Sequence, residues 1–256
     1  MQDAVLHIKD LCIAFGSKTV LHDVSLSLEC GKTLAIVGES GSGKSVTAMA
    51  VLGLLPKSTK VQGSIFFEGV ELQNASASLL RTIRGNNIAM IFQEPMTSLN
   101  PVFTVGEQIE ETVRLHRNLS RKQAKEVSMS ALEEVGISSK RFSSYPHEFS
   151  GGMRQRVMIA MALVCEPMLL IADEPTTALD ATTSRQIMKL LHALKTQRAM
   201  SMLFISHDLK LVASIADDVC VMQHGRVVER GIAREVLHAP KHAYTQELVS
   251  CIPTLG

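Results

Sequence analysis

The stretch Leu34-Ala-Ile-Val37-Gly38-Glu-Ser-Gly-Ser-Gly-Lys44-Ser45 decides the fold of this chain. Its four consecutive apolar residues, Leu34–Val37, predict a buried strand, and the apolar pattern that starts at Lys44 predicts a helix. Residues Gly38–Ser45, called the phosphate-binding loop below, match the pattern G-x-x-x-x-G-K-[ST]. Glycines allow the tight turn in which successive N–H groups point at phosphate oxygens. The stretch therefore predicts an α/β protein that binds a nucleotide.

Every residue of the phosphate-binding loop is a candidate ligand of that nucleotide. We expect Lys44 to place its ammonium on the terminal phosphates and the Ser45 hydroxyl to bind magnesium. The other candidates form the cradle around the phosphates: Gly38, Glu39, Ser40, Gly41, Ser42 and Gly43. A glycine-rich loop without a ligand is the alternative, and the strand before it and the helix after it both argue against that alternative.

The composition is that of an ordinary globular protein. The 256 residues are 46% hydrophobic and 20% charged, and the net charge of +1 does not favour nucleic acid as a partner. The five cysteines form no Cys-x-x-Cys pair, which disfavours a structural zinc site and fits reduced thiols in a cytosolic protein. We expect neither a signal peptide nor a membrane-spanning segment.

Strand-like and helix-like patterns alternate along the rest of the chain. Alternating apolar residues predict half-buried strands over Val5–Phe15 and Leu21–Leu28, and glycines bound a third strand at Gly63–Gly69. Short continuous apolar runs predict buried strands of a parallel sheet: Leu34–Val37, Met168–Ala172, Met202–Ile205 and Val219–Met222. Apolar residues near helical spacing from Val105 to Val135 predict two helices of an inserted subdomain.

A pair of carboxylates follows one of these apolar runs. Leu169–Ala172 ends at Asp173 and Glu174, which places both acids at the carboxyl edge of the sheet, where α/β folds bind ligands. We expect Asp173 to hold magnesium through water and Glu174 to act as the general base on the attacking water. The alternative is a solvated acidic turn that caps the next helix.

Two more features fit a phosphate site. His207 follows the apolar run Met202–Ile205 and could hydrogen-bond the γ-phosphate and the catalytic water, although a lone histidine there is also commonly structural. Ser150, Gly151 and Gly152, called the second glycine turn below, open a predicted helix and form a second candidate anion site. A small-residue turn into a helix is the alternative for this turn.

Taken in order, these motifs resemble those of the ATP-binding subunit of ABC transporters over essentially the whole chain. The family's motifs fall at Walker A 38–45, the Q-loop residue Gln93, the signature 149–153, Walker B 169–174, the D-loop Thr177–Asp180 and the switch residue His207. The resemblance implies a P-loop NTPase core with an N-terminal antiparallel β-subdomain and an inserted α-helical subdomain. It implies one domain over 1–256, with the core and β-subdomain at 1–95 and 166–256 and the helical subdomain at 96–165.

The resemblance also implies ATP hydrolysis with Mg²⁺ by a head-to-tail pair of subunits. ATP would lie between one subunit's phosphate-binding loop and the other subunit's second glycine turn. Gln93 would contact magnesium together with Ser45 and Asp173, and Asp180 would cross the dimer interface. The catalytic residues would be Lys44, Gln93, Glu174 and His207. Such a pair closes on ATP and opens after hydrolysis, which performs work on membrane subunits.

Two positions depart from the family pattern. Phe15 is the candidate for stacking on adenine, where the family often has tyrosine, so the stacking is kept and the hydroxyl is lost. The signature reads Phe149-Ser-Gly-Gly-Met153 instead of Leu-Ser-Gly-Gly-Gln, so its fifth position has no side-chain amide. Neither change touches a catalytic candidate, and we expect an active ATPase.

Flanking residues narrow the resemblance to bacterial dipeptide, oligopeptide and nickel importers. The segments that carry it are Gln93–Pro101, Tyr145–Arg156 and Ala239–Thr245. It implies a second ATPase, identical or homologous, and two permeases at the cytoplasmic face of the bacterial inner membrane, fed by an extracytoplasmic solute-binding protein, without nucleic acid. Because only Cys251 lies near the short tail, we infer no iron–sulfur site from the resemblance. The short tail slightly favours the nickel members, and both nickel and small peptides stay open as solutes.

Superfamily ATPases that act outside transport are the alternative class of function. A DNA-repair ATPase would need a long heptad insertion between the phosphate-binding loop and the second glycine turn, and a translation factor would carry two cassettes. The sequence shows one cassette and no sustained heptad. A binding module without catalysis would be expected to lack Glu174 or His207, and a simple kinase gives no reason for Phe149–Arg156.

Overall fold

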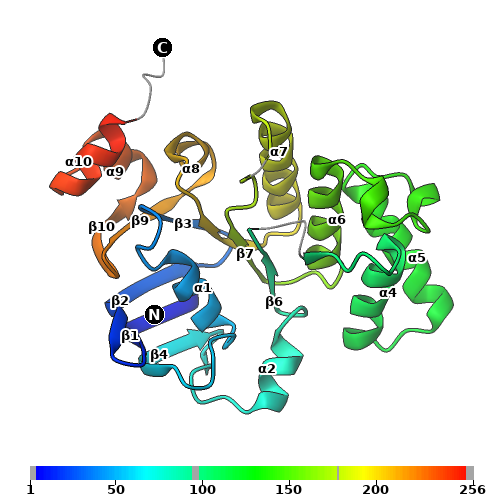
Figure 1. The fold of residues 1–256 in the computed structure, drawn as a ribbon, viewed down its shortest axis with the longest axis horizontal. Helices are drawn as coiled ribbons and strands as arrows, with labels where there is room; N and C mark the ends of the chain where they lie inside the picture. The colour runs from blue at the N-terminus through cyan, green and yellow to red at the C-terminus, as the bar shows by residue number, and fades with distance from the viewer. Residues whose placement is uncertain (1–3, 94–97, 178, 252–256) are drawn as a thin grey trace. The chain divides into compact units, whose positions relative to one another are not determined.

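The computed structural model describes residues 4–93, 98–177 and 179–251 (Figure 1). The chain forms two compact units, unit 1 with residues 1–81 and 199–256 and unit 2 with residues 82–198. The expected subdivision at 95/96 and 165/166 stays a prediction, and its first boundary lies outside the described residues.

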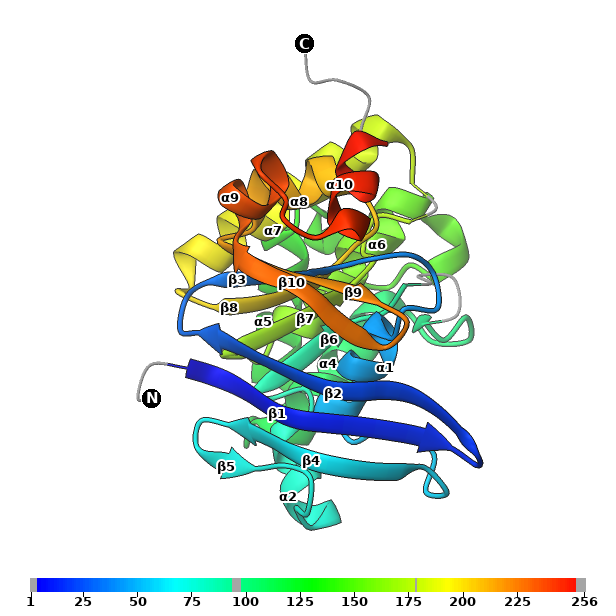
Figure 2. The same ribbon diagram turned by 90° about the vertical axis from the view of Figure 1, so that its left-hand side faces the viewer.

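Unit 1 begins with an antiparallel sheet in the order β2-β1-β4-β5, which Figure 2 shows most clearly. Its strands are β1 Ala4–Phe15, β2 Lys18–Glu29, β4 Lys60–Phe67 and β5 Val70–Glu71. Apolar side chains that alternate along these strands are buried, as the sequence predicts, and they form the core of this sheet: Leu6, Ile8, Ile13, Leu26, Leu28 and Ile65.

Strand β4 is longer than the predicted Gly63–Gly69 strand and contains Gly63 in its interior. Gly63 has a φ of +94°, and a Cβ there would lie 2.5 Å from the Asp10 carbonyl oxygen. Asp10 itself has a positive φ, where the register between β1 and both of its neighbours shifts. Gly63 therefore marks a close backbone approach at a bulge inside the strand and not the beginning of the strand.

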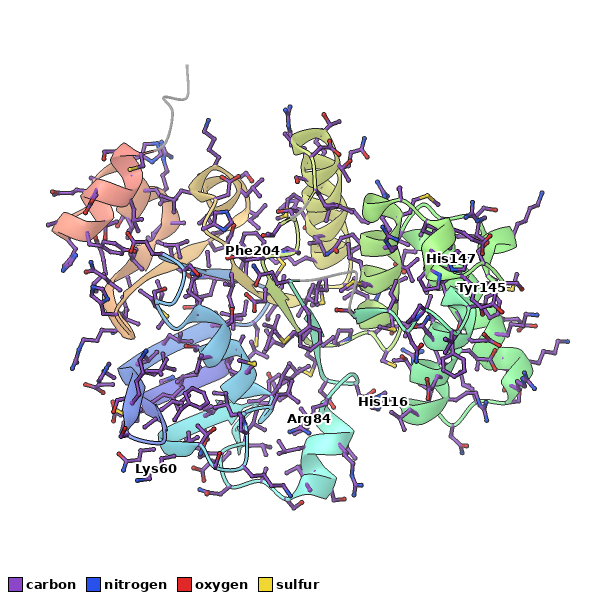
Figure 3. All side chains as sticks on the ribbon, in the orientation of Figure 1. Lys60, Arg84, His116, Tyr145, His147 and Phe204 are labelled. Atoms are coloured by element: carbon purple, nitrogen blue, oxygen red, sulfur yellow. The ribbon has the colours of Figure 1, made fainter. Side chains whose placement is uncertain are left out.

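The second sheet region of unit 1 has the order β10-β9-β3-β8. Strand β3 pairs in parallel with β8 and β9, and β10 pairs antiparallel with β9. The bounds are β3 Thr33–Val37, β8 Ser201–Ile205, β9 Asp218–Gln223 and β10 Arg226–Ile232. Every residue of β3 and β8 is buried, and Phe204 on β8 is the largest fully buried side chain among the described residues (Figure 3). The continuous apolar runs are therefore strands covered on both faces, as predicted.

Helices complete unit 1. They are α1 Lys44–Val51, α8 Leu209–Ile215, α9 Ala233–His238 and α10 Ala243–Ser250. Helix α2, Ala77–Ile83, runs across the boundary between the two units. The sequence patterns had predicted α1, and the two helices near the C-terminus had no predicted counterpart.

In its described residues, unit 2 contains the parallel pair β6 Ile88–Ile91 and β7 Leu169–Asp173 together with four long helices. Those helices are α4 Val105–His116, α5 Arg121–Glu134, α6 Gly151–Leu163 and α7 Ala181–Gln197, with short 3-10 turns at Ser139–Arg141 and Pro146–Glu148. Capping boxes at Thr104 and Ser120 start α4 and α5, which confirms the two predicted helices. The four-stranded antiparallel sheet, the sheet with parallel and antiparallel strand pairs and these helices confirm the expected α/β fold class.

Candidate nucleotide-binding site

The phosphate-binding loop connects β3 to α1 in unit 1, and its shape depends on three glycines. Gly38, Gly41 and Gly43 have φ values of +147°, +80° and +105°, a region that side-chain-bearing residues rarely adopt. A Cβ on Gly38 would overlap the carbonyl oxygen of Met222, and a Cβ on Gly43 would overlap the side chain of Leu21. The backbone of β9 therefore leaves room only for glycine at position 38, and the positive φ favours glycine at position 43 as well.

Lys44 is buried although it carries a charge, with 5% of its surface exposed. Its ammonium donates hydrogen bonds to the carbonyl oxygens of Gly38 and Glu39, both at 2.8 Å. The ammonium thus lies at the start of the loop, where phosphate oxygens of a ligand could replace the two carbonyl oxygens as its hydrogen-bond acceptors. Ser42 Oγ is also buried, and it has no hydrogen-bond partner among the described residues. A buried cation and an unpaired hydroxyl in one loop fit an anionic ligand.

Neighbouring backbone holds the loop in this shape. Gly225, in the turn between β9 and β10, donates its N–H to the Ser42 carbonyl at 3.1 Å and accepts from the His22 N–H at 2.8 Å. The Glu39 N–H donates to the Tyr244 hydroxyl at 3.0 Å. Tyr244 was not among the predicted site residues, because the segment Ala239–Thr245 indicates only the family resemblance and no contact with the loop.

Two other predicted residues belong to unit 1. His207 follows β8 and is exposed, and the parallel pairing of Ile36 with Ile205 puts it at the same sheet edge as the phosphate-binding loop. Phe15 ends β1 and is partly exposed, which leaves its ring available for stacking. The structure thus brings His207 and the phosphate-binding loop to one edge, as predicted, and their roles stay predictions.

The predicted acidic residues lie in unit 2, at the end of the fully buried strand β7. Asp173 is buried, and Glu174 has a φ of +47°, which is uncommon for a residue with a side chain. Glu174 Oε2 accepts hydrogen bonds from Gln93 Nε2 at 3.1 Å and from Thr177 Oγ1 at 2.7 Å. The structure therefore places two predicted catalytic residues, Gln93 and Glu174, in direct contact.

A strained backbone and two side-chain donors fix the Glu174 carboxylate. A positive φ outside glycine costs of order 1 kcal/mol or more and often occurs at functional sites. Such a carboxylate is aimed by its surroundings and can accept a proton from water. The solvated helix cap that sequence analysis kept as an alternative does not match these contacts, because Asp180 is the N-cap of α7.

The second glycine turn starts α6 in unit 2. Ser150 is the N-cap, and its Oγ accepts from the Met153 N–H at 3.4 Å. A Cβ on Gly152 would lie 2.5 Å from Thr183 Cγ2, because α6 and α7 pack closely there. Gly151 has room for a methyl group, since its Cβ would lie 3.5 Å from Leu179 Cδ2. Packing alone thus requires the second glycine of the turn, whatever the turn binds.

Aromatic side chains lie just before this turn. Tyr145 and His147 stack with ring centroids 5.7 Å apart (Figure 3). The Arg141 guanidinium lies 4.5 Å from the centroid of the buried Phe149 ring and donates to the Glu148 carbonyl at 3.0 Å. The buried Phe149 ring and Arg141 therefore hold the start of the turn against the 3-10 turn Ser139–Arg141, which gives the aromatic residue at the first signature position a structural role.

Asp180 has a local structural task in addition to its predicted interface role. Its Oδ1 accepts from the N–H groups of Thr182 and Thr183 at 3.0 Å, and its Oδ2 accepts from Thr183 Oγ1 at 2.6 Å. The hydrogen bond from the Thr183 hydroxyl is the main reason why the pKa of Asp180 lies below its ordinary value. Ala178 of the predicted D-loop lies outside the described residues, as do residues 94–97 after Gln93.

No helix in the part of the chain that the structure describes is long and apolar enough to cross a membrane.

Comparisons with known proteins agree with these motifs. The model of the ABC transporter family matches residues 21–177. The oligopeptide transport ATP-binding protein OppD of Escherichia coli (strain K12) is 51% identical over 259 residues, covering 99% of this chain and 77% of OppD. The glutathione import ATP-binding protein GsiA of the same strain is 50% identical over 265 residues, covering 98% of this chain and 42% of GsiA. The chain thus spans less than half the length of GsiA.

Solved structures show the same fold. The protein cbiO1 from Clostridium perfringens, part of the ABC transporter complex cbiONQ, superposes with a TM-score of 0.81 at 28% identity, covering 93% of this chain and 92% of that one. The ATP-binding cassette MJ0796, in a dimeric post-hydrolysis state with ADP and Pi, superposes with a TM-score of 0.78 at 25% identity, covering 90% and 99%.

The chain belongs to the ABC transporter family. It is an ATP-binding subunit of that family and hydrolyses ATP.

Proposed function

We propose that the chain powers a bacterial ABC importer for small peptides. The observation that supports ATP as the energy source is the phosphate-binding loop, in which the carbonyl oxygens of Gly38 and Glu39 hold the buried Lys44 ammonium. The peptide part is supported by OppD and GsiA, which are named for oligopeptide transport and glutathione import. Neither name refers to nickel, and nickel uptake stays a prediction.

We propose a role for each site residue, taken unit by unit. In unit 1 the phosphate-binding loop and Lys44 bind the phosphates of ATP, Phe15 stacks on adenine, and His207 hydrogen-bonds the γ-phosphate. In unit 2 Glu174 takes a proton from the attacking water while Gln93 and Thr177 hold its carboxylate in place. The second glycine turn serves the ATP of a partner subunit, because α6 presents the positive end of a thirteen-residue helix there.

The residues present fit a magnesium ion. Ser45 and Asp173 offer the hydroxyl and carboxylate oxygens that Mg²⁺ prefers, and Gln93 offers an amide oxygen. When bound, the ion neutralises charge on the phosphates of ATP. Ser45 lies in the first turn of α1 and Asp173 ends β7, and each offers few oxygen ligands, which fits an ion held largely by phosphate and water without a dedicated protein cage.

The proposed partners are a second ABC ATPase subunit, two permeases and, indirectly, a solute-binding protein outside the cytoplasm. The cbiO1 structure is part of a transporter complex, and MJ0796 is dimeric, which supports an assembly of this kind. The proposed location is the cytoplasmic face of the inner membrane, as a peripheral subunit.

The test is transport by the assembled importer. The chain is co-expressed with the membrane subunits encoded beside it, the complex is purified and reconstituted in vesicles, and ATP-driven uptake is measured with a labelled dipeptide, glutathione and ⁶³Ni²⁺ in parallel. We expect uptake of a peptide that requires ATP and is lost in Lys44→Ala. ATP-dependent uptake of nickel without uptake of either peptide would contradict the peptide assignment.

A further inference from the structure

The C-terminal part of unit 1 reaches the phosphate-binding loop through one side chain. Tyr244, in the first turn of α10, is 5% exposed, and its hydroxyl accepts the Glu39 N–H at 3.0 Å. Glu39 is the second residue of the loop and is itself exposed. Helix α10 packs against α9 (Figure 1). A residue about 200 positions away in sequence thus fixes the backbone of the loop.

The loop needs such an anchor because glycine leaves its backbone free. Gly38, Gly41 and Gly43 have positive φ values, and glycine restricts its own backbone little, so contacts from outside the loop that hold its N–H groups in place reduce the cost of ordering it around a phosphate. The Gly225 N–H fixes the later part of the loop through the Ser42 carbonyl. Tyr244 fixes the earlier part, between Gly38 and Gly41.

A carboxylate on β10 holds the segment that carries Tyr244. Glu229 accepts from the N–H groups of Lys241 at 2.8 Å and His242 at 3.1 Å. His242 Nδ1 in turn accepts from the Tyr244 N–H at 3.2 Å and caps α10. Burial acts to raise the pKa of Glu229, but the nearby Thr245 side chain and the hydrogen bonds from the Lys241 and His242 N–H groups outweigh it and leave the pKa lowered. The charged carboxylate therefore fixes the start of α10.

We propose that Tyr244 is a positioning residue for ATP binding, held in place by Glu229. Its hydroxyl keeps the start of the phosphate-binding loop in the conformation that receives phosphate, so that removing the hydroxyl weakens ATP binding without changing the catalytic groups. The proposal rests on the proposed function, in which this loop binds ATP. A tyrosine that serves only to pack α10 would affect stability and leave ATP affinity unchanged.

Tyr244→Phe separates the two roles because it keeps the ring and removes only the oxygen that accepts from Glu39. The purified full chain is titrated with ATP and Mg²⁺ in competition with a fluorescent ATP analogue, well below the unfolding temperature, and the melting temperature is recorded. We expect the dissociation constant for ATP to rise about three- to tenfold, the size of one hydrogen bond. The matched control is Tyr145→Phe, at the chain's other tyrosine, with an unchanged constant.

Glu229→Gln provides an independent variant should Tyr244→Phe lower the melting temperature into the assay range. It keeps the size of the side chain and weakens the hydrogen bonds at the start of α10, and we expect ATP binding about twofold to fivefold weaker. In the assembled importer, both variants should raise the KM for ATP and leave kcat unchanged. ATP constants within experimental error of wild type in both variants would overturn the proposal.

Lys44→Ala distinguishes failure of this inference from failure of the proposed function. If Lys44→Ala abolishes ATP binding while Tyr244→Phe and Glu229→Gln bind like wild type, the inference is wrong and the proposed function stands. If the wild-type chain does not bind ATP, the proposed function and the inference are both wrong.

Discussion

Replacing Gly152 by alanine is expected to destabilise unit 2, whereas the same replacement at Gly151 is not. The new Cβ would lie 2.5 Å from Thr183 Cγ2 at position 152, but 3.5 Å from Leu179 Cδ2 at position 151. Thr183 cannot turn away at low cost, because its hydroxyl donates to Asp180 Oδ2 at 2.6 Å and its rotamers are restricted in a helix. The backbones of α6 and α7 would have to separate.

The size of the effect follows from two opposing terms. Overpacking a close contact costs about 1–3 kcal/mol, and alanine in place of glycine in a helix gains up to about 1 kcal/mol. Gly152→Ala should therefore lower the free energy of unfolding by about 1–2 kcal/mol, and Gly151→Ala should leave it equal or slightly higher. Thr183→Ser removes the clashing methyl group and keeps the hydroxyl, so the double variant should recover about 1 kcal/mol.

Urea unfolding of the full chain, followed by far-ultraviolet circular dichroism, measures all four variants. The double-mutant cycle should show coupling between positions 152 and 183 well above the 0.3–0.5 kcal/mol or so expected of independent sites. A Gly152→Ala chain as stable as Gly151→Ala, or an additive cycle, would refute the packing argument. ATP hydrolysis of the rescued double variant in the assembled pair then reports whether the turn also needs glycine to bind phosphate.

Three more predictions concern charge and burial. Lys44→Ala should weaken ATP binding about a hundredfold or more, because charge-assisted hydrogen bonds to phosphate are lost. A rise of less than about tenfold in the dissociation constant for ATP, measured in the competition titration, would contradict the role of Lys44. The lowered pKa of Asp180 means that its stabilisation is present above its ordinary value of 3.8 and is lost as the pH falls through the folded-state pKa. Asp180→Ala should therefore lower the urea midpoint at pH 7, and the difference from wild type should shrink as the pH falls below 3.8. Burial raises the pKa of the Cys220 thiol to about 12. Iodoacetamide at pH 8 should therefore label the exposed Cys30 and Cys251 first, and Cys220 only in denaturant. Early labelling of Cys220 in peptide mass spectra would contradict its burial.

The phosphate-binding loop and the buried strands could be predicted from local sequence patterns. The loop motif fixes its own geometry through Gly38 and Gly43, and the apolar runs of β3 and β7 need cover on both faces wherever they lie in the chain. The family resemblance implied a role for both Gln93 and Glu174 at the catalytic water, but the hydrogen bond between their side chains, across 81 residues, is a finding of the structure.

Contacts between distant segments could not be predicted in this way. Nothing in the sequence near Tyr244 shows that its hydroxyl meets Glu39, and nothing near Gly152 shows that Thr183 lies against it. Gly63 was read as the beginning of a strand because its role depends on a bulge in β1, a different strand. Such features depend on how elements pack, which periodicity does not encode.

The most direct test of the account is ATP hydrolysis by the assembled transporter that carries Glu174→Gln, with Glu166→Gln as the control. Both glutamates have a positive φ, +47° and +54°, but Glu166 is 68% exposed in its side chain and lies at 3.4 Å from the Arg117 guanidinium. Because a general base contributes about 10²–10⁴-fold, Glu174→Gln should hydrolyse ATP at least about a hundredfold more slowly than wild type while still binding it. The Glu166→Gln rate should stay within about twofold of wild type. Hydrolysis by Glu174→Gln at the wild-type rate would contradict the account.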